Sequence, residues 1–125
     1  MDVEYFFFQI EEAECLENVK ALIDKCDDID VLDNLGFNRN ILHTAISFKR
    51  SEVAIYLIGR GININQQDKN GFTPLHFCVE YKNAIVAKEL IQKGANGNIK
   101  NKFDMTPFEM AEHRDLADMV QVLKG

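Results

Sequence analysis

Histidine and cysteine are the residue types in this chain that could support nucleophilic catalysis or metal binding. The chain has three of each among its 125 residues. Catalysis of this kind needs a histidine beside a nucleophile, with a third group that orients the histidine. Cys78 follows His76 by two residues, which places the two side chains on different faces of a helix. We therefore predict no catalytic pair here and interpret Cys78 as a small core residue.

The sequence also predicts no metal or phosphate site. His113 has no second histidine or cysteine at the spacing of a zinc-ligand pair. Gly71 and Gly94 do not belong to a G-x-x-x-x-G-K pattern, so we assign them to a turn and to a helix end. We expect no enzyme, no cofactor and no small-molecule substrate. An enzyme or metal protein would require His43, His113 and a cysteine to converge in one pocket.

Two of the histidines share a position in an internal repeat. A shift of 33 residues places Leu75-His76 on Leu42-His43, and Gly94 on Gly61. A period near 33 residues indicates one supersecondary unit that is stacked on itself. Matching positions in stacked units indicate a shared structural role, so we expect His43 and His76 to support the fold rather than to catalyse a reaction.

Residues 71–76 read GFTPLH, and residues 94–98 read GANGN after a helical stretch. These residues closely resemble the ankyrin repeat. The resemblance covers nearly the whole chain and is strong over residues 36–107. It implies an all-α fold, a solenoid of helix-turn-helix units with short hairpin-like turns. It also implies that the His76 imidazole bonds back to the start of its own helix.

We expect a single domain over residues 1–125, with units at about 2–30, 31–63, 64–96 and 97–125. The first unit lacks the T-P-L-H start, as terminal repeats commonly do, because one of their faces meets water. The turn at residues 33–40 is two residues longer than its counterpart at Asp68, and insertions of this kind often lie on the binding face. The expected helices cover residues 3–13, 15–25, 41–49, 52–59, 74–81, 84–92 and 116–123, with another starting at Thr106-Pro107.

The helix boundaries are predicted from capping residues. Thr73 is the expected N-cap, Asn40 takes its place one unit earlier, and Pro74 is the first helical residue, where its missing N–H costs nothing. Thr106 and Glu109 form a capping box in which Glu109 replaces the usual histidine. Helix-ending glycines complete the set. We assign structural roles to eight residues: Thr73, Pro74, His76, His43, Thr106, Glu109, Gly61 and Gly94.

Charge is distributed unevenly along the chain. The net charge is −6, yet residues 1–33 contain eleven acids and two bases, a balance of −9. Nucleic acid is therefore an unsuitable partner, because phosphate contacts need a basic surface. The acidic end is either a solvated cap or a region that steers a basic partner. Scattered cysteines, an acidic start and no long apolar stretch favour a cytoplasmic protein without a membrane segment.

Aromatic residues recur at turn and helix-end positions that should face solvent on the concave side. Phe37 and Phe72 each follow a turn glycine, and Phe48 and Tyr81 each lie five residues after a repeat histidine. Aromatic residues, methionine and arginine are enriched in interface cores. The alternative is that some rings pack onto neighbouring units. We call the predicted binding surface the aromatic strip, which consists of Phe37, Phe48, Phe72, Tyr81, Phe103, Met105, His113 and Arg114.

These observations predict a protein that binds another protein through the aromatic strip, and the partner is basic if the acidic end steers it. A binder without an attached enzyme domain or anchor acts most simply as an inhibitor. The resemblance implies either a bacterial immunity protein against a toxin or a signalling regulator of eukaryotes and their viruses. An assembly adaptor is the other alternative, with a second patch at residues 6–8. We expect at least two of these three phenylalanines to be core residues.

Overall fold

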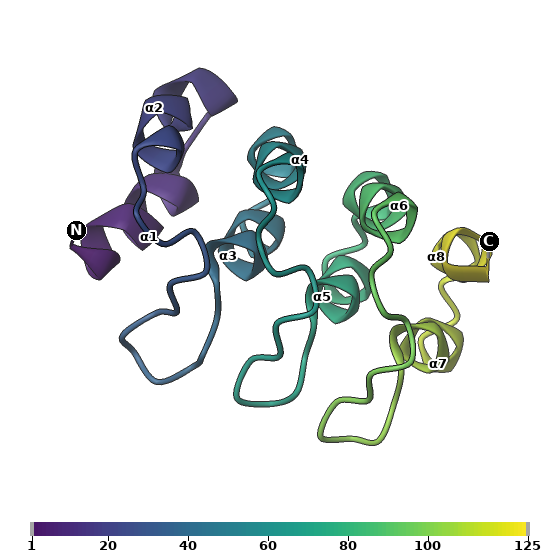
Figure 1. Ribbon diagram of the computed structural model, residues 1–125. Coiled ribbons are helices and arrows are strands. Elements are labelled where there is room, and N and C mark those ends of the chain that lie inside the picture. The colour runs from purple at the N-terminus through teal and green to yellow at the C-terminus, as the bar shows by residue number, and fades with distance from the viewer. Residues whose placement is uncertain (1, 125) are drawn as a thin grey trace.

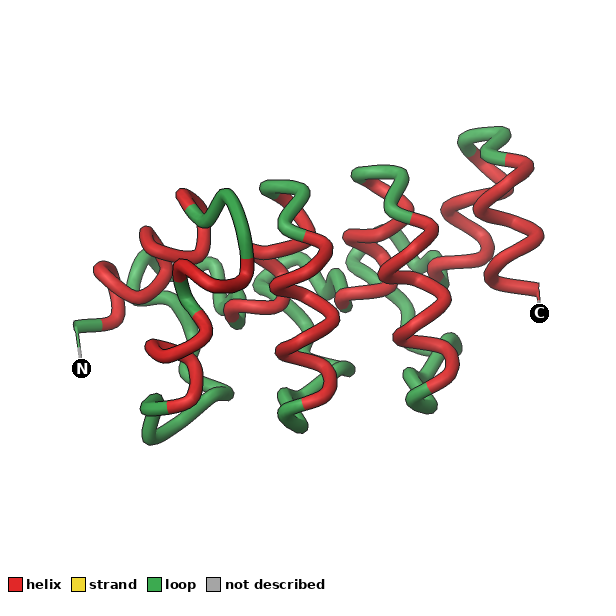
Figure 2. Tube along the Cα trace, turned by 90° about the horizontal axis from the view of Figure 1, so that it is seen from above, coloured by secondary structure: helices red, strands yellow, loops and turns green. Residues whose placement is uncertain are grey.

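The computed structural model describes residues 2–124 as a row of stacked helix pairs, with the two termini at opposite ends (Figures 1 and 2). These residues contain α-helices and one short 3-10 helix but no strand. The all-α helix-turn-helix architecture is therefore confirmed. The elements are α1 (Val3–Glu12), η1 (Leu16–Asn18), α2 (Lys20–Asp24), α3 (Ile41–Ser47), α4 (Ser51–Gly59), α5 (Pro74–Glu80), α6 (Ala84–Gln92), α7 (Pro107–His113) and α8 (Ala117–Lys124).

The helices form two layers. The layer of α1, α3, α5 and α7 lies next to the long turns, and α2, α4, α6 and α8 form the second layer (Figure 1). Helix α3 packs against α1, α4 and α5, and α6 packs against α4, α5 and α8. The core between the layers is apolar and includes the fully buried Leu42, Leu57 and Leu90. Each pair therefore covers its apolar face only with its neighbours. No helix among residues 2–124 has the length and apolarity that a bilayer crossing requires.

Capping boxes start the first helix of three pairs. At α5, Thr73 Oγ1 accepts a hydrogen bond from the His76 N–H (3.3 Å), and His76 Nδ1 accepts one from the Thr73 N–H (3.0 Å). Pro74 occupies the first helical turn. These bonds satisfy N–H groups that have no partner within the helix. The same reciprocal arrangement is made by Asn40 with His43 at α3 and by Thr106 with Glu109 at α7.

The first-layer helices end earlier than predicted. Helices α3 and α5 stop at Ser47 and Glu80, so the ranges 41–49 and 74–81 were too long. The reason is a left-handed residue two positions later, with φ of 61° at Lys49 and 56° at Lys82. A left-handed residue cannot continue a right-handed helix. Phe48 and Tyr81 are consequently the C-cap residues of these helices.

The first pair departs most from expectation. The single helix predicted over residues 15–25 is wrong, because this segment is divided into η1 and the five-residue α2. The division occurs at Val19, whose φ of −124° and ψ of −5° lie outside the helical region. Val19 is buried, so packing of its side chain accompanies the change in backbone direction. Phe6 and Phe7 are core residues and Phe8 is exposed, which confirms the prediction for this triplet.

Neighbouring turns touch through their backbones. The Lys102 N–H donates to the Asn70 carbonyl (2.9 Å), and the Lys69 N–H donates to the Phe37 carbonyl (2.8 Å). Gly71 has a φ of +79°, and a Cβ placed there would lie 3.0 Å from the Asn101 Cα. The turn therefore requires glycine both for its backbone conformation and for the close approach of the next turn.

We expect Gly71→Ala to destabilise the chain more than Gly36→Ala does, by about 1–3 kcal/mol, the usual cost of overpacking. Both glycines have positive φ, so both variants incur the same conformational cost. Only at Gly71 would the new methyl group meet backbone atoms, since nothing lies within 4 Å of a Cβ at Gly36. Urea unfolding of the two variants measures the difference. Equal losses would show that the turns move apart without cost.

Candidate functional site

The two repeat histidines are buried and connect successive helix pairs. His43 Nδ1 accepts a hydrogen bond from the Asn40 N–H (3.1 Å), so the proton lies on Nε2, which donates to the Phe72 carbonyl (3.0 Å). His76 Nε2 donates in the same way to the Met105 carbonyl (2.9 Å). Both ring nitrogens are thus engaged in structural bonds. Burial raises the pKa of the neighbouring Cys78 thiol, which disfavours the reactive thiolate.

Metal-binding residue types are not clustered in the described part of the chain. Among residues 2–124, no three histidine, cysteine, aspartate or glutamate side chains are grouped so that they could hold a metal ion. The described cysteines are free thiols. His43 and His113 do not converge, because His43 is buried and bonded to the Phe72 carbonyl whereas His113 is exposed at the end of α7.

The buried histidines predict a pH-dependent stability. Burial lowers the pKa of His43 to about 4 from 6.5, and it lowers the pKa of His76 as well. The unfolded chain therefore binds protons that the folded chain excludes, so the stability is complete above about pH 6.5 and is lost as the pH falls toward 4. We expect His43 alone to contribute a loss of about 1–2 kcal/mol between pH 6.5 and 5.

Urea unfolding at several pH values tests this expectation. His43→Gln should flatten the pH dependence of the unfolding free energy in this window, whatever its effect on stability at neutral pH. His113→Gln is the matched control, because His113 is exposed. If the unfolding free energy of His43→Gln depends on pH as steeply as that of the wild type, the loss of stability would have to come from the protonation of other groups, such as the carboxylates.

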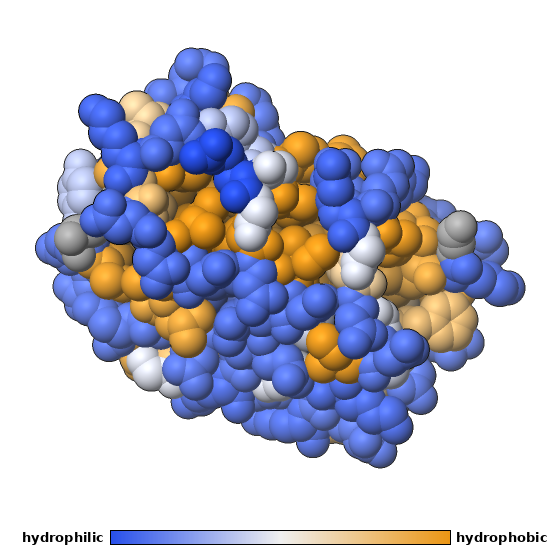
Figure 3. Space-filling view, viewed as in Figure 1, coloured by the Kyte–Doolittle hydropathy of each residue, from blue (hydrophilic) through white to orange (hydrophobic). Residues whose placement is uncertain are grey.

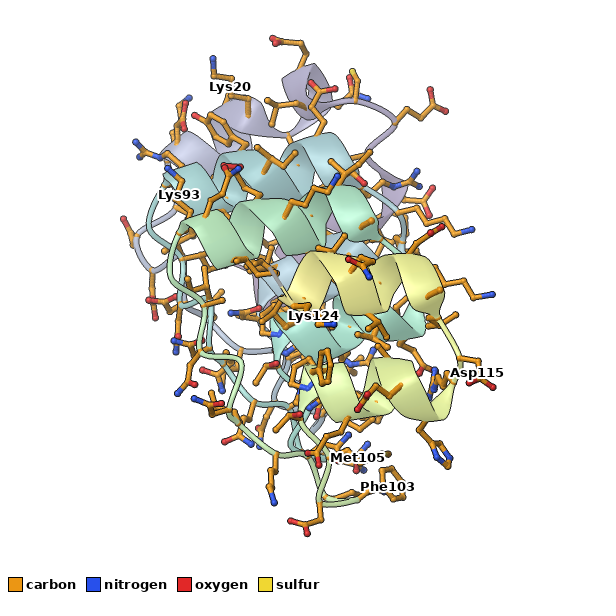
Figure 4. All side chains as sticks on the ribbon, turned by 90° about the vertical axis from the view of Figure 1, so that its right-hand side faces the viewer. Lys20, Lys93, Phe103, Met105, Asp115 and Lys124 are labelled. Carbon is orange, nitrogen blue, oxygen red and sulfur yellow. The ribbon has the colours of Figure 1, made fainter. Side chains whose placement is uncertain are left out.

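A chain of ring contacts crosses the third and fourth helix pairs. Phe103 meets Phe72 with ring centroids 6.4 Å apart, Phe72 meets Phe77 at 6.3 Å, and Phe77 meets Tyr81 at 5.9 Å. The two ends of the chain reach solvent, since Phe103 is 60% and Tyr81 38% exposed, whereas Phe77 is buried. Figure 4 shows Phe103 and Met105 together below α7, on the opposite side of the helices from Lys20 and Lys93. The contacts therefore link a turn tip to the end of α5.

The turn at residues 33–40 is longer than its counterpart by two residues, as expected. It is closed by a bond from the Asp33 N–H to the Arg39 carbonyl (2.8 Å), whereas the next turn is closed from Asp68 to Phe72 (2.9 Å). Arg39 thus occupies the place that Phe72 has in the following turn. The predicted equivalence of Phe37 and Phe72 is confirmed at the start of the turn, where the N–H of each donates to the aspartate carboxylate four residues earlier. It does not extend to the end of the turn, where the Phe37 carbonyl accepts from Lys69 as that of Asn70 does from Lys102.

Comparison with known protein families agrees with this architecture. The family described as ankyrin repeats (3 copies) matches residues 8–101 and, in an overlapping placement, residues 63–124. The chain belongs to the ankyrin-repeat family. Ankyrin repeats are protein–protein interaction modules, and members of the family are typically not enzymes.

Two members of the aromatic strip lie deeper in the ankyrin stack than predicted. Phe72 and Met105 are half-buried and pack against the core. Their carbonyls accept the bonds from His43 and His76, so their backbones lie against the preceding repeat. The expectation that the Phe72 ring faces solvent is therefore wrong, because the ring is half-buried. Phe77, which spacing alone did not single out, is buried at the centre of the ring contacts.

The exposed rings at the ankyrin turn tips are accompanied by cations. Arg39 and Lys69 lie 5.2 Å and 5.1 Å from the Phe37 ring centroid, and Lys102 lies 5.1 Å from that of Phe103. Such cations are attracted to the ring faces. In Figure 3 the edge formed by the turns is mostly hydrophilic, with small separate hydrophobic patches. The strip at the tips therefore consists of single rings set among charged side chains.

The remaining strip residues lie at the ends of the first-layer helices. Phe48 and Tyr81 are exposed C-cap residues in successive repeats, and Arg114 is the C-cap of α7. Arg114 forms an ion pair with Glu80, which joins α7 to the end of α5. His113 precedes Arg114 and is exposed. Phe48 and His113 lie outside the chain of ring contacts, so the strip is continuous only from Phe103 to Tyr81.

Proposed function

We propose that this ankyrin-repeat chain binds a partner protein through the aromatic strip and neutralises that partner. The observation that carries the proposal is the chain of ring contacts whose two ends, Phe103 and Tyr81, are exposed. A buried ring in the middle fixes the positions of the exposed ones. Rings held in place lose little conformational entropy when a partner covers them.

The extent of the strip suits a protein partner rather than a small ligand. Exposed rings occur at the first turn tip and at the ends of α3 and α5, and again at the last turn tip. Stacked helices lie about 10 Å apart, so these positions span several helix diameters. A standard interface takes about 800 Å² from each partner, which a strip of this length can supply.

Neutralisation is the simplest action of a surface that covers its partner. A role like that of bacterial toxin-immunity proteins fits it, and the free thiols favour work in the reducing cytoplasm. A signalling regulator is the second candidate and would use the same surface. An assembly adaptor needs a second contact surface, for which Phe8 on α1 is the exposed member of residues 6–8.

Affinity capture from cells of the source organism tests the proposal. We expect the tagged chain to retain one dominant protein, identified by mass spectrometry, and Tyr81→Ala to lose it. When the chain is added to the captured protein, the activity of that protein should fall in proportion to the amount of complex formed. If the tagged chain retains two proteins at once, and Phe8→Ala loses one of them, the result would favour the role of assembly adaptor. Retention that is insensitive to Tyr81→Ala would contradict the assigned surface.

A further inference from the structure

A groove lies between α1 and the lengthened turn at residues 33–40. It encloses about 490 Å³, which is within the range of about 300–1,000 Å³ found for ligand sites. Three large apolar side chains from α1 and two from the turn line it. Phe7 is buried, and the other four are substantially open to solvent: Tyr5 (54% exposed), Phe8 (53%), Leu35 (66%) and Phe37 (38%). Four large apolar side chains that converge in this way indicate an interaction site.

Negative charge surrounds this apolar groove. Asp2, the N-cap of α1, lines it together with Glu4 and Glu11 of α1 and Asp33 of the turn. Arg39 is the cation among the lining residues, and Lys69 lies 5.1 Å from the Phe37 ring centroid. The Asp33 carboxylate is fixed in place, because it accepts hydrogen bonds from the N–H groups of Phe37 (3.1 Å) and Arg39 (3.3 Å). The four carboxylates outnumber the two cations, Arg39 and Lys69, so the groove repels an acidic occupant and attracts a basic one.

Arg39 is held in a fixed position at the groove. Its guanidinium carbon lies 5.2 Å from the Phe37 ring centroid and 5.5 Å from that of Phe77, so the group lies between two rings. The Arg39 Nε is buried and has no acceptor among residues 2–124. Because this atom is shielded from solvent, an occupant of the open groove cannot supply its acceptor, and Arg39 acts on an occupant through its charge.

We infer that the groove binds a short protein segment in which bulky apolar side chains are flanked by lysine or arginine. The apolar side chains would contact Phe8 and Leu35, and the cations would pair with Glu4 and its acidic neighbours. The inference rests on the proposed function in one respect, that the occupant is a protein. It goes further by giving the chemistry of the segment and by placing it outside the aromatic chain from Phe103 to Tyr81.

The charges differ between the two sides of the groove. Lys69 lies 5.1 Å from the Phe37 ring centroid on the side of the turn, and Lys102 lies 5.1 Å from the Phe103 centroid at the last turn tip. The carboxylates of Glu4 and Glu11 lie on the α1 side, so the basic residues of the segment would lie against α1.

Selection of a random peptide library on the full chain tests the inference. We expect the recovered peptides to combine lysine or arginine with leucine, isoleucine or aromatic residues. Labelled synthetic copies should bind the wild-type chain, and Phe8→Ala and Glu4→Lys should each weaken binding by about tenfold or more. The matched controls Ile85→Ala and Glu52→Lys alter an exposed apolar and an exposed acidic residue on α6 and α4 and should leave binding unchanged.

The outcomes separate this inference from the proposed function. The inference would be overturned if the recovered peptides were acidic or polar, or if the selection enriched no peptides. It would also be overturned if the peptides bound both groove variants as well as the wild-type chain. Self-association that Phe8→Ala abolishes would show that a second copy occupies the groove and would overturn it too. Tyr81→Ala should not affect the peptides, because Tyr81 lies outside the groove. If the peptides bind the groove as expected but Tyr81→Ala does not weaken binding of the captured partner, the proposed function is contradicted while this inference still holds.

Discussion

Leu90→Ala is expected to lower the free energy of unfolding by about 2–5 kcal/mol, the range for removing a large side chain from a packed core. Leu90 is fully buried on α6, which packs against α4, α5 and α8. A stack of repeats has no separate core that could compensate, because every apolar face is covered by a neighbouring repeat. The truncation therefore weakens several contacts between helices at once.

Urea unfolding followed by circular dichroism measures this loss. Gln92→Ala on the same helix is the matched control and should change stability by no more than about 0.5 kcal/mol, since Gln92 is exposed. Leu75→Ala on α5 should resemble Leu90→Ala, because Leu75 is also buried. A loss below about 2 kcal/mol would contradict the cavity expected at Leu90. Two separate transitions would show that the repeats do not unfold together.

Helix starts could be predicted from the sequence because they depend on neighbouring residues. Thr73, Pro74 and His76 specify the beginning of α5 within four positions, and the observed bonds of the capping box are local. The second bond of each histidine is different. His43 Nε2 reaches the Phe72 carbonyl 29 residues later, a contact that depends on how two repeats are stacked. The local role was therefore predictable, whereas the link between repeats was not.

The errors in the binding surface have the same origin. Phe37 was aligned from the turn glycine, which is correct for the start of the turn but not for its end, where the closing bond runs from Asp33 to Arg39. The burial of Phe72 results from rings contributed by other turns and helices, namely Phe77 and Phe103. Spacing along one repeat does not reveal such packing. The break at Val19 likewise combines poor helix propensity with burial that depends on the tertiary structure.

These corrections change the choice of residue for probing the interface. Phe72→Ala would remove a half-buried ring that contacts Phe77, Phe103 and the His76 ring, so a loss of binding could reflect a loss of folding. Tyr81 is the better probe. It lies at the C-cap of α5, is exposed at one end of the ring chain and rests on Phe77.

Tyr81→Ala is expected to weaken the complex with the captured partner by about 2 kcal/mol or more, because aromatic residues near the centre of an interface carry much of its binding energy. Calorimetric titration measures the affinity, and urea unfolding of the free variant shows whether the fold persists. Phe48→Ala, at the same position one repeat earlier, should weaken binding in the same direction.

The controls Lys88→Ala and Gln92→Ala lie on the exposed side of α6, in the layer away from the turns, and should leave the affinity unchanged. The alternative result is that Tyr81→Ala lowers the stability strongly while its folded fraction binds the partner with unchanged affinity. That result would show that Tyr81 only packs against Phe77 and does not contact the partner. A loss of affinity in Lys88→Ala would place the partner on the second helix layer. Only weakened binding by a stably folded Tyr81→Ala, with both α6 controls unaffected, agrees with the aromatic strip as the interface.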